Sequence, residues 1–212
     1  MNGFKQALVA LMVAINIASC DTGVQQKLPI IGNTQYVEVN GKIDTVYHTI
    51  PPFKLVDQEG DTVTEKTVEG KIYVADFFFG TCPSICPVMA QQMLRVHEKF
   101  KEVDDFAILS HTIDPAHDTV AYLKGYAEKL GVMNNDTWHF LTGPQEEIYE
   151  LGEKDYMVTV GQDANAPGGF IHSGHFWLVD KERRLRGFYD GTIASHVDRL
   201  MNDIKKLQAE YE

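Results

Sequence analysis

The chain has 212 residues, of which 44% are hydrophobic, and this size indicates one globular domain with a full core. The formal net charge is −11, which argues against nucleic acid as a partner and leaves no basic patch for anionic lipid. Three cysteines occur, at positions 20, 82 and 86, and the first needs a different explanation from the other two.

The chain begins with the pattern of an export signal. One positive charge, at Lys5, precedes an apolar stretch over 7–18 that is too short for a comfortable membrane span. The stretch ends in Ile17-Ala18-Ser19-Cys20, which resembles the lipobox of bacterial lipoproteins, in which the cysteine is lipidated and becomes the first mature residue. We therefore predict a lipoprotein signal peptide over 1–19 and a lipid anchor on Cys20, with a plain secretory signal as the alternative. Either form is exported to a compartment that can oxidise thiols, and the anchored form faces the periplasm or the cell exterior from the bacterial membrane.

A polar segment follows the signal. Residues 20–40 contain scattered Gly and Gln, and we expect them to form a flexible tether between the membrane and a domain over 41–212. Short strand-like pieces occur at 46–50, 53–56 and 62–64, separated by turn-forming residues. These pieces predict a β extension in front of the main fold.

The most informative stretch combines a strand with two cysteines. Ile72 to Phe79 is an apolar run rich in β-branched and aromatic residues, which predicts a buried central strand. Cys82 and Cys86 follow where the strand leads into a helix, and at this spacing both sulfurs point to one side of a helical turn. A helix N-terminus favours thiolate over thiol, so we expect two low-pKa thiols that can close a disulfide or bind one soft metal ion such as Cu(I). A pair of inert buried thiols is the alternative.

The residues after the cysteines predict a helix. Over 87–103, apolar residues recur at helical spacing, and Met89 and Met93 belong to this apolar stripe. Their spacing favours a place in the core over a role as metal ligands. His97 lies off the stripe, and we expect it to face solvent.

Strands and helices alternate through the rest of the chain. The predicted elements are a strand over 106–113, a helix from an N-cap at Asp118 to a C-cap at Gly131, a strand over 138–141, a helix over 144–154, a hairpin of strands over 175–179 and 184–189, and a closing helix over 195–211. Residues 161–171 are Gly-rich and are expected to be irregular. This order predicts an α/β fold with a mixed central sheet and helices on both of its faces.

A central strand followed by two cysteines at a helix start is typical of thioredoxin-like proteins, which use C-x-x-C, whereas this chain has C-x-x-x-C. The longer spacing resembles that of the SCO/SenC family, and the resemblance covers nearly the whole chain after position 20. Four blocks carry it: FFGTCPSICP over 78–87, TIDPAHDT over 112–119, WHFLTG over 138–143, and HS, LVD and YDG within 172–191.

The resemblance implies a thioredoxin-like fold that binds one copper ion, Cu(I) or Cu(II), and helps to build the CuA centre of cytochrome c oxidase. It implies that the ligands are Cys82, Cys86 and a distant histidine that maps to His172, which agrees with the preference of Cu(I) for thiolate sulfur and imidazole. His175 is the rival ligand. It follows three residues later in the same predicted strand, where alternation would aim it at the opposite face.

Asp114 is another position that the resemblance marks. An aspartate at the end of a strand, beside the cysteine turn, can orient a ligand or influence thiol protonation. It can equally begin the turn into the next helix and do no more. The sequence leaves both interpretations open.

Three functions fit these residues. The first is a membrane-anchored copper chaperone that delivers copper to the CuA-bearing subunit II of cytochrome c oxidase or to another exported cuproprotein. The second is a thiol-disulfide oxidoreductase, in which Cys82 attacks, Cys86 resolves the mixed disulfide, and a Cys82–Cys86 disulfide is the oxidised form. A peroxidase ranks last, because no Arg matches a peroxide pocket. A third ligand at His172 favours the chaperone, since thiol exchange needs no third ligand.

Overall fold

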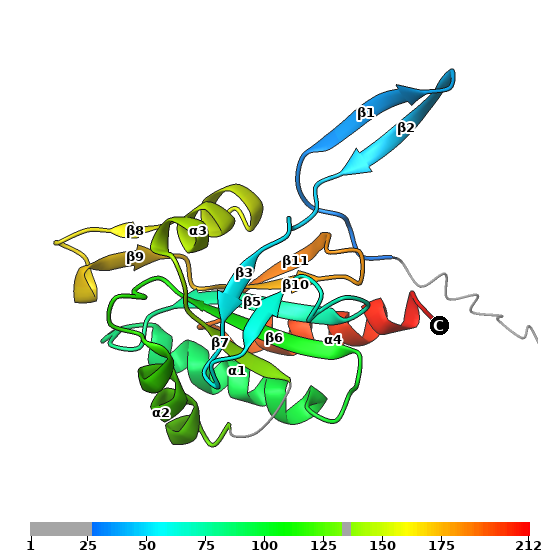
Figure 1. Cartoon of the computed structure of the whole chain (residues 1–212). Helices are drawn as coiled ribbons and strands as arrows, with labels where there is room; N and C mark the ends of the chain where they lie inside the picture. The colour runs from blue at the N-terminus through cyan, green and yellow to red at the C-terminus, as the bar shows by residue number, and fades with distance from the viewer. Residues whose placement is uncertain (1–26, 133–136) are drawn as a thin grey trace, which may run out of the picture.

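The computed structural model of the chain describes residues 27–132 and 137–212 (Figure 1). The predicted signal peptide over 1–19, the predicted lipid anchor at Cys20 and the first part of the predicted tether lie outside the described residues. Within the two described ranges, no helix combines the length and the apolar character that a membrane crossing needs.

A five-stranded sheet with the strand order β11-β10-β5-β6-β7 forms the centre of the fold. Its strands are β5 (Ile72–Phe78), β6 (Phe106–Thr112), β7 (Trp138–Leu141), β10 (His175–Val179) and β11 (Leu185–Asp190). The first three run parallel, whereas β10 runs antiparallel to both β5 and β11. The predicted mixed sheet is therefore confirmed, and β5 lies at its centre with every residue buried.

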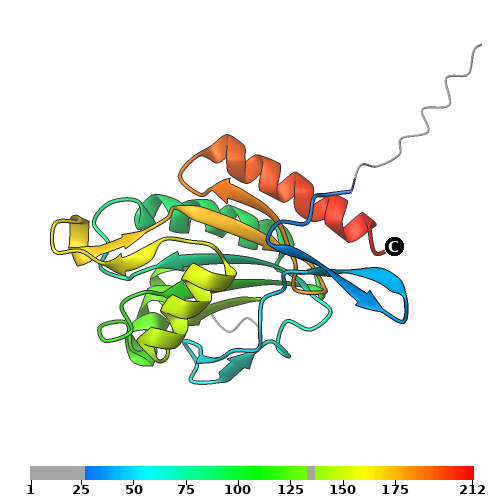
Figure 2. The ribbon, with the colours of Figure 1, turned by 90° about the horizontal axis from the view of Figure 1, so that it is seen from above.

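Helices cover both faces of this sheet. They are α1 (Cys86–Phe100), α2 (Val120–Leu130), α3 (Gln145–Glu150) and α4 (Ala194–Ala209). Tyr73 and Phe77 of β5 contact Tyr156, which follows α3, whereas Asp76 and Phe78 point to the other face and line a small cavity together with residues of α1 and α2. Figures 1 and 2 show α3 on one side of the sheet and α1, α2 and α4 on the other. Helices on both faces are what the sequence predicts.

Helix α1 buries its predicted apolar stripe, and Met89 and Met93 are 1% and 0% exposed, which places them in the core. His97 is also buried, with its ring 5.5 Å from that of Trp138, so the prediction that it faces solvent is wrong. The physical reason is its position one helical turn after Met93, on the side that packs against the sheet.

Two further helix predictions need correction. Helix α2 takes Thr119 as its N-cap, because the Thr119 side chain accepts the N–H of Tyr122, so Asp118 is not the cap. Gly131 is the C-cap, as predicted. The helix predicted over 144–154 is α-helical only to Glu150 and continues as the π-helical turn η1 (Leu151–Asp155).

In the described part of the chain, three short hairpins lie outside the main sheet: β1 (Thr34–Val39) with β2 (Lys42–Tyr47), β3 (Lys54–Val56) with β4 (Thr62–Thr64), and β8 (Val160–Gln162) with β9 (Phe170–His172). The last includes the short 3-10 turn η2 (Pro167–Gly169), so the expectation of an irregular stretch over 161–171 is wrong at both of its ends. The strand predicted over 46–50 is displaced as well, because β2 ends at Tyr47.

The described part of the predicted tether is also structured. Strand β1 lies within it and pairs with β2 through a two-residue turn at Asn40 and Gly41, whose φ angles are 53° and 76°. Positive φ at both positions is the geometry that Asn-Gly favours in a hairpin. Before β1, Leu28 donates its N–H to Glu210, and Ile31 pairs with Leu185. The flexible segment that the sequence predicts over 20–40 is therefore corrected from Leu28 onward.

Candidate metal centre

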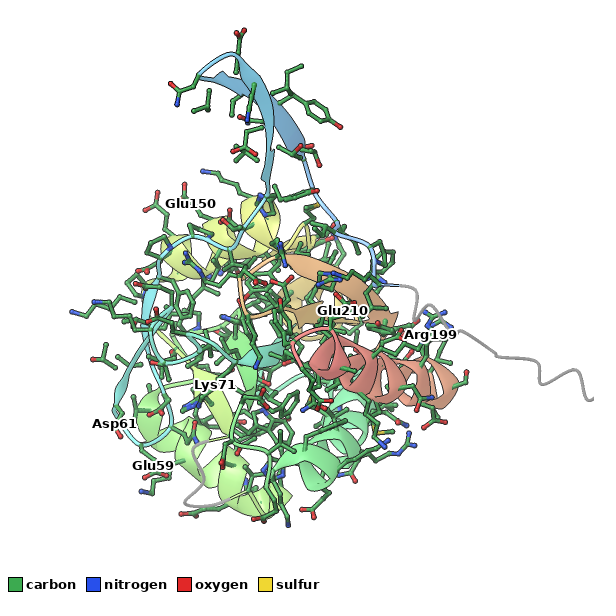
Figure 3. All side chains as sticks on the ribbon, turned by 90° about the vertical axis from the view of Figure 1, so that its right-hand side faces the viewer. Glu59, Asp61, Lys71, Glu150, Arg199 and Glu210 are labelled. Atoms are coloured by element: carbon green, nitrogen blue, oxygen red, sulfur yellow. The ribbon has the colours of Figure 1, made fainter. Side chains whose placement is uncertain are left out.

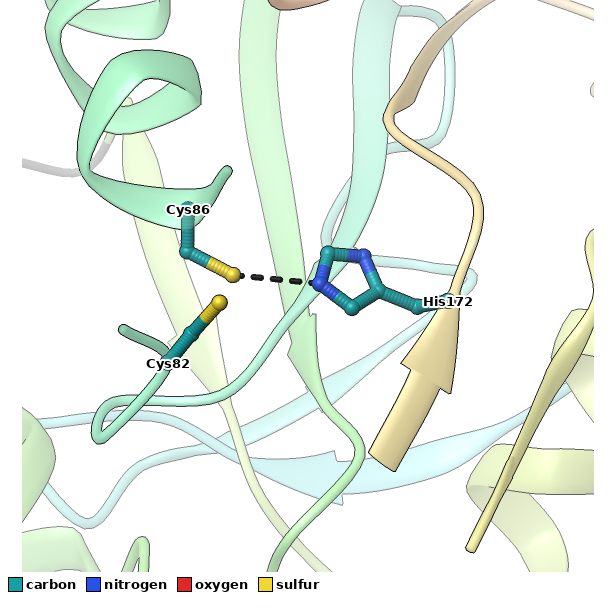
Figure 4. Close-up of side chains that lie close together, drawn as sticks. All are labelled: Cys82, Cys86 and His172. Carbon is teal, nitrogen blue, oxygen red and sulfur yellow. Dashed lines mark hydrogen bonds between the residues drawn. The ribbon is translucent and has the colours of Figure 1, made fainter. Parts of the chain in front are cut away.

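The two cysteines lie on a turn between β5 and α1. The N–H of Cys82 bonds to the carbonyl of Phe79 at 3.2 Å, whereas Cys86 is the first residue of α1. The expectation that both lie on one helical turn is therefore wrong for Cys82, which precedes the helix. The sulfurs still converge, because the turn folds the Cys82 side chain back toward the start of α1 (Figure 4).

A buried carboxylate fixes the beginning of this turn. Asp118 is fully buried and accepts hydrogen bonds from the N–H of Gly80 at 2.8 Å and from the hydroxyl of Thr112. Gly80 has no room for a side chain, since a Cβ there would lie 2.2 Å from the Tyr122 ring and 2.9 Å from Asp118. The turn is thus held against the end of β6 and the start of α2, a role that the sequence-based N-cap assignment of Asp118 misses.

His172 reaches the cysteines from the far end of the chain. It ends β9, which packs on the turn through Phe170, whose ring lies 5.1 Å from that of Phe79. The Nε2 atom of His172 lies 3.1 Å from the Sγ of Cys86, and its Nδ1–H donates to the carbonyl of Ser173 at 3.3 Å. This second bond leaves the Nε2 lone pair directed at the sulfur (Figure 4).

The three ligand atoms of Cys82, Cys86 and His172 lie within 4.8 Å of one another. All three are soft or borderline donors, and the group contains no carboxylate, which favours a soft ion such as Cu(I) over Mg²⁺ or Ca²⁺. The hollow beside the group is lined by uncharged side chains, among them Phe79, Ile85 and Ile171. The donor set and its surroundings therefore fit a thiophilic metal ion.

The two thiols differ in acidity. Burial raises the pKa of Cys82, but hydrogen bonds from Cys86 and Ser84 outweigh it, so the pKa lies below the ordinary thiol value. Burial, together with the hydrogen bond shared with Cys82, raises the pKa of Cys86 well above that value. The prediction of two low-pKa thiols is thus wrong for Cys86. Burial lowers the pKa of His172, which favours the neutral imidazole that a metal needs.

The rival histidine lies elsewhere. His175 begins β10, a different strand from the one that His172 ends, so the premise of a single strand is wrong. Its ring packs edge-on against Phe188 at 5.6 Å. Among the described residues, only His172 joins the two cysteines in a group of metal-ligating atoms.

Asp114 begins the turn into the next helix, which is one of the two interpretations that the sequence leaves open. Its carbonyl accepts the N–H groups of His117 and Asp118, and its own N–H bonds to the Thr112 hydroxyl. Its carboxylate is not part of the cysteine–histidine group. In this structure Asp114 therefore shapes the turn that places Asp118.

The residues that support the site are not predictable from local sequence. Phe170 packs against Phe79, and Asp118 accepts the N–H of Gly80, each from a segment distant in sequence. No local sequence pattern predicts either contact.

Comparison with known proteins gives a consistent result. The sequence model of the family described as SCO1/SenC matches residues 42–209. The SCO1 protein homolog of Bacillus subtilis (strain 168) is 31% identical over 164 residues, which cover 76% of this chain and 84% of the relative. The solved structure of BsSco, described as a member of the Sco family of cytochrome c oxidase assembly proteins with a disulfide switch, has a TM-score of 0.66 and 30% identity, and covers 76% of this chain and 93% of that one. The structure of Arabidopsis thaliana ScoI with copper bound has a TM-score of 0.61 and 28% identity, and covers 74% and 98%.

Proposed function

The chain belongs to the SCO1/SenC family, and from that premise we propose that it is an exported, membrane-anchored copper chaperone. It binds one copper ion through Cys82, Cys86 and His172 and delivers it to the CuA-bearing subunit II of cytochrome c oxidase or to another exported cuproprotein. The copper is cargo, so the site must both bind the ion and release it.

One observation carries this proposal: two thiols and one neutral imidazole from distant parts of the chain converge to within 4.8 Å. Two thiolates give the soft sulfur ligands that Cu(I) prefers, and the imidazole completes a three-coordinate set. A relative of the same fold has been solved with copper bound, which supports the choice of metal. Since Cys82 and His172 line a hollow at the surface, a partner can approach the bound ion.

A copper titration tests the binding. We expect the fully reduced protein to retain one copper per chain after dialysis, measured by metal analysis. His175→Ala is the matched control, because this histidine lies outside the group. A stoichiometry near zero in the reduced protein would contradict the proposal.

The anchor is tested separately. The lipobox-like end of the signal makes Cys20 the lipidated residue, so Cys20→Ser should release the protein from membranes or block its processing. Fractionation of cells into membrane and soluble pools measures this. A fully processed variant that stays in the membrane pool would defeat the lipid anchor, and it would leave the copper site untouched.

The acidity of the thiols supports a second candidate function, thiol-disulfide exchange. The pKa of Cys82 is lowered and that of Cys86 is raised, as expected for a nucleophile and a resolving thiol. The Cys82 thiolate would attack a partner disulfide, form a mixed disulfide and release one partner thiolate. Deprotonated Cys86 would then attack Cys82, release the second partner thiolate and leave the Cys82–Cys86 disulfide, so two electrons pass to the partner.

One variant separates the two functions. His172→Ala should weaken copper binding and leave disulfide exchange nearly intact, because exchange needs no third ligand. If cells carrying His172→Ala assemble active oxidase as well as wild type while Cys82→Ala cells do not, thiol reduction is the cellular function. If both variants fail, copper delivery is the function.

A further inference from the structure

The hairpin β1–β2, called here the N-terminal ribbon, projects from the body of the molecule as a two-stranded sheet of its own (Figures 1 and 3). Its apolar side chains are unusually exposed: Ile43 is 77% and Tyr36 is 74% exposed. An isolated two-stranded ribbon is marginally stable in water, and its outer edges present unpaired backbone groups. A contact with another surface would stabilise such a ribbon by covering its exposed apolar side chains.

The strand register places the aromatic residues on one face of the ribbon. Tyr36 pairs with Thr45 and Thr34 with Tyr47, so Tyr36 and Tyr47 share a face, and Ile43, opposite Glu38, lies on that face too. The three alternate between the two strands and are called here the tyrosine face. Their exposure rises from 39% at Tyr47 toward the tip. The opposite face carries Val37, Val39 and Val46 and no aromatic residue.

The segment that leads to the ribbon is bound to the body of the molecule. Arg186 donates to the carbonyls of Leu28 and Pro29, and Ile31 pairs with Leu185. If Cys20 is the lipid anchor, as proposed above, only seven residues separate it from Leu28. The eight Cα-to-Cα steps from Cys20 to Leu28 reach at most about 29 Å, which is comparable with the ~20 Å length of a six-residue strand. The ribbon is therefore kept within reach of the bilayer that holds the anchor.

The ribbon leaves the body at the end of the sheet opposite the metal centre. Beside the base of the ribbon, the N–H of Ile50 bonds to the carbonyl of Arg183, which lies four residues after the end of β10. The last residue of β10, Val179, pairs with Tyr73 near the beginning of β5. The cysteine turn follows the other end of β5. The length of the central strand thus separates the two, and Figure 1 shows β1–β2 and β8–β9 at opposite ends of the molecule.

We propose that the tyrosine face docks on the headgroup region of the lipid bilayer in which Cys20 is anchored; this rests on the proposed lipid anchor. Tyrosine prefers this region, because its ring is apolar and its hydroxyl is polar. The unpaired edges keep the ribbon at the interface and out of the hydrocarbon. The contact is apolar, not electrostatic, since the chain is acidic and Glu38, Lys42 and Asp44 give the ribbon no net positive charge.

Because the lipid on Cys20 already holds the chain at the membrane, a weak contact between the tyrosine face and the bilayer is sufficient for docking. A tethered face meets the bilayer at a high effective concentration, and a lipid chain plus a second contact is the usual requirement for stable attachment. Two points of attachment also fix the orientation of the domain. With the ribbon on the bilayer, the metal centre at the opposite end of the sheet points away from the membrane, toward the exposed part of a membrane-bound partner.

Photo-crosslinking maps the contact in the full-length lipidated protein. The protein is incorporated into phosphatidylcholine vesicles whose headgroups carry a diazirine, and the labelled residues are identified by mass spectrometry. We expect residues 34–47 to be labelled at least fivefold more than the peptides around Phe188 and Val88, which are exposed apolar residues outside the ribbon. Equal or lower labelling of the ribbon in vesicle-bound protein would overturn the proposal.

A matched pair of variants tests which face docks. Tyr36→Thr with Ile43→Thr should lower the ribbon labelling at least threefold, whereas Val39→Thr with Val46→Thr on the opposite face should not. Threonine keeps the β propensity in both pairs. Equal effects of the two pairs would overturn the face assignment. Ribbon labelling that rises as lipid is added at constant protein would overturn the proposal too, because dilution in the membrane would then be uncovering a ribbon that a second copy of the chain had covered. Failure of the wild type to float with the vesicles would instead defeat the Cys20 anchor on which the proposal rests.

Discussion

Two hairpins outside the main sheet, β8–β9 and β1–β2, are similar in their local structure and opposite in their packing. Each is a short antiparallel pair, and each has a turn glycine with positive φ, Gly168 at 79° and Gly41 at 76°. The first packs on the cysteine turn through Phe170 and Phe79, and the second projects into solvent. The pairing of two strands therefore does not by itself position a ligand, because a rigid neighbour must hold the hairpin in place.

The packed hairpin is held closely enough to fix one imidazole. Gly168 lies so near the Phe79 ring that a Cβ would sit 2.7 Å from it, and the same ring makes an edge contact with His172 at 5.8 Å. Phe79 directly follows the last residue of β5. His172 is therefore positioned by the same strand that leads into Cys82 and Cys86.

The largest effect is expected at the cysteines. Cys82→Ala or Cys86→Ala should lower copper affinity at least a thousandfold, about 4 kcal/mol, because each removes one of two soft ligands. Competition with a Cu(I) chelator measures the affinity, and amide exchange should find both hairpins as protected as in wild type. Wild-type affinity in either variant would place the copper elsewhere in the chain.

The sequence was informative where a pattern is local. The apolar run of β5, the methionine stripe of α1 and the two cysteines each carry their own signal, and the structure has them close to the expected positions. His172 was assigned through resemblance, because its approach to Cys86 joins residues 86 positions apart. Asp118 and Phe170 could not be assigned, since their contacts exist only after the segments have packed. The N-terminal ribbon does carry a local signal, because Asn40-Gly41 favours a hairpin turn, yet the polar composition of 20–40 predicts a tether there.

The next effect is expected at the third ligand. His172→Ala should lower copper affinity about 10- to 100-fold, as expected for one ligand of a small site. His175→Ala should leave the affinity unchanged, because its ring packs on Phe188, away from the cysteines. The same chelator competition measures both. If His175→Ala alone weakened binding, the packed hairpin would not supply the ligand and the comparison of the two hairpins would fail.

Gly168→Ala should displace the packed hairpin without removing a ligand. The new Cβ would clash with the Phe79 ring, and a φ of 79° is unfavourable for alanine. We expect copper affinity to fall about tenfold, roughly 1.4 kcal/mol, and the free energy of unfolding to fall by about 1–3 kcal/mol. Denaturant unfolding and copper competition on one sample measure the two effects. Unchanged affinity together with lost stability would mean that His172 reaches the copper without the packed hairpin.

Acid should loosen the packed hairpin. Burial lowers the pKa of His172, so the detached hairpin binds a proton at a higher pH than the docked one. The docked state therefore keeps its full stability above the ordinary histidine pKa, about 6.5, and loses it as the pH falls toward the lowered value. Amide exchange of residues 170–172 between pH 7 and 5, corrected for intrinsic rates, measures this in metal-free protein. His172→Asn should abolish the pH dependence, and its persistence there would assign it to another group.

The smallest effect is expected in the projecting hairpin. Gly41→Ala places alanine at a φ of 76°, which costs about 1–2 kcal/mol locally, as at Gly168. No atom lies within 4 Å of the new Cβ, however, and the ribbon forms a sheet separate from the five-stranded one. We therefore expect faster amide exchange over residues 34–47, a change of less than about 0.5 kcal/mol in the free energy of unfolding, and unchanged copper affinity. A loss of global stability as large as that of Gly168→Ala would show that the ribbon unfolds together with the core, and that its independence from the body is only apparent.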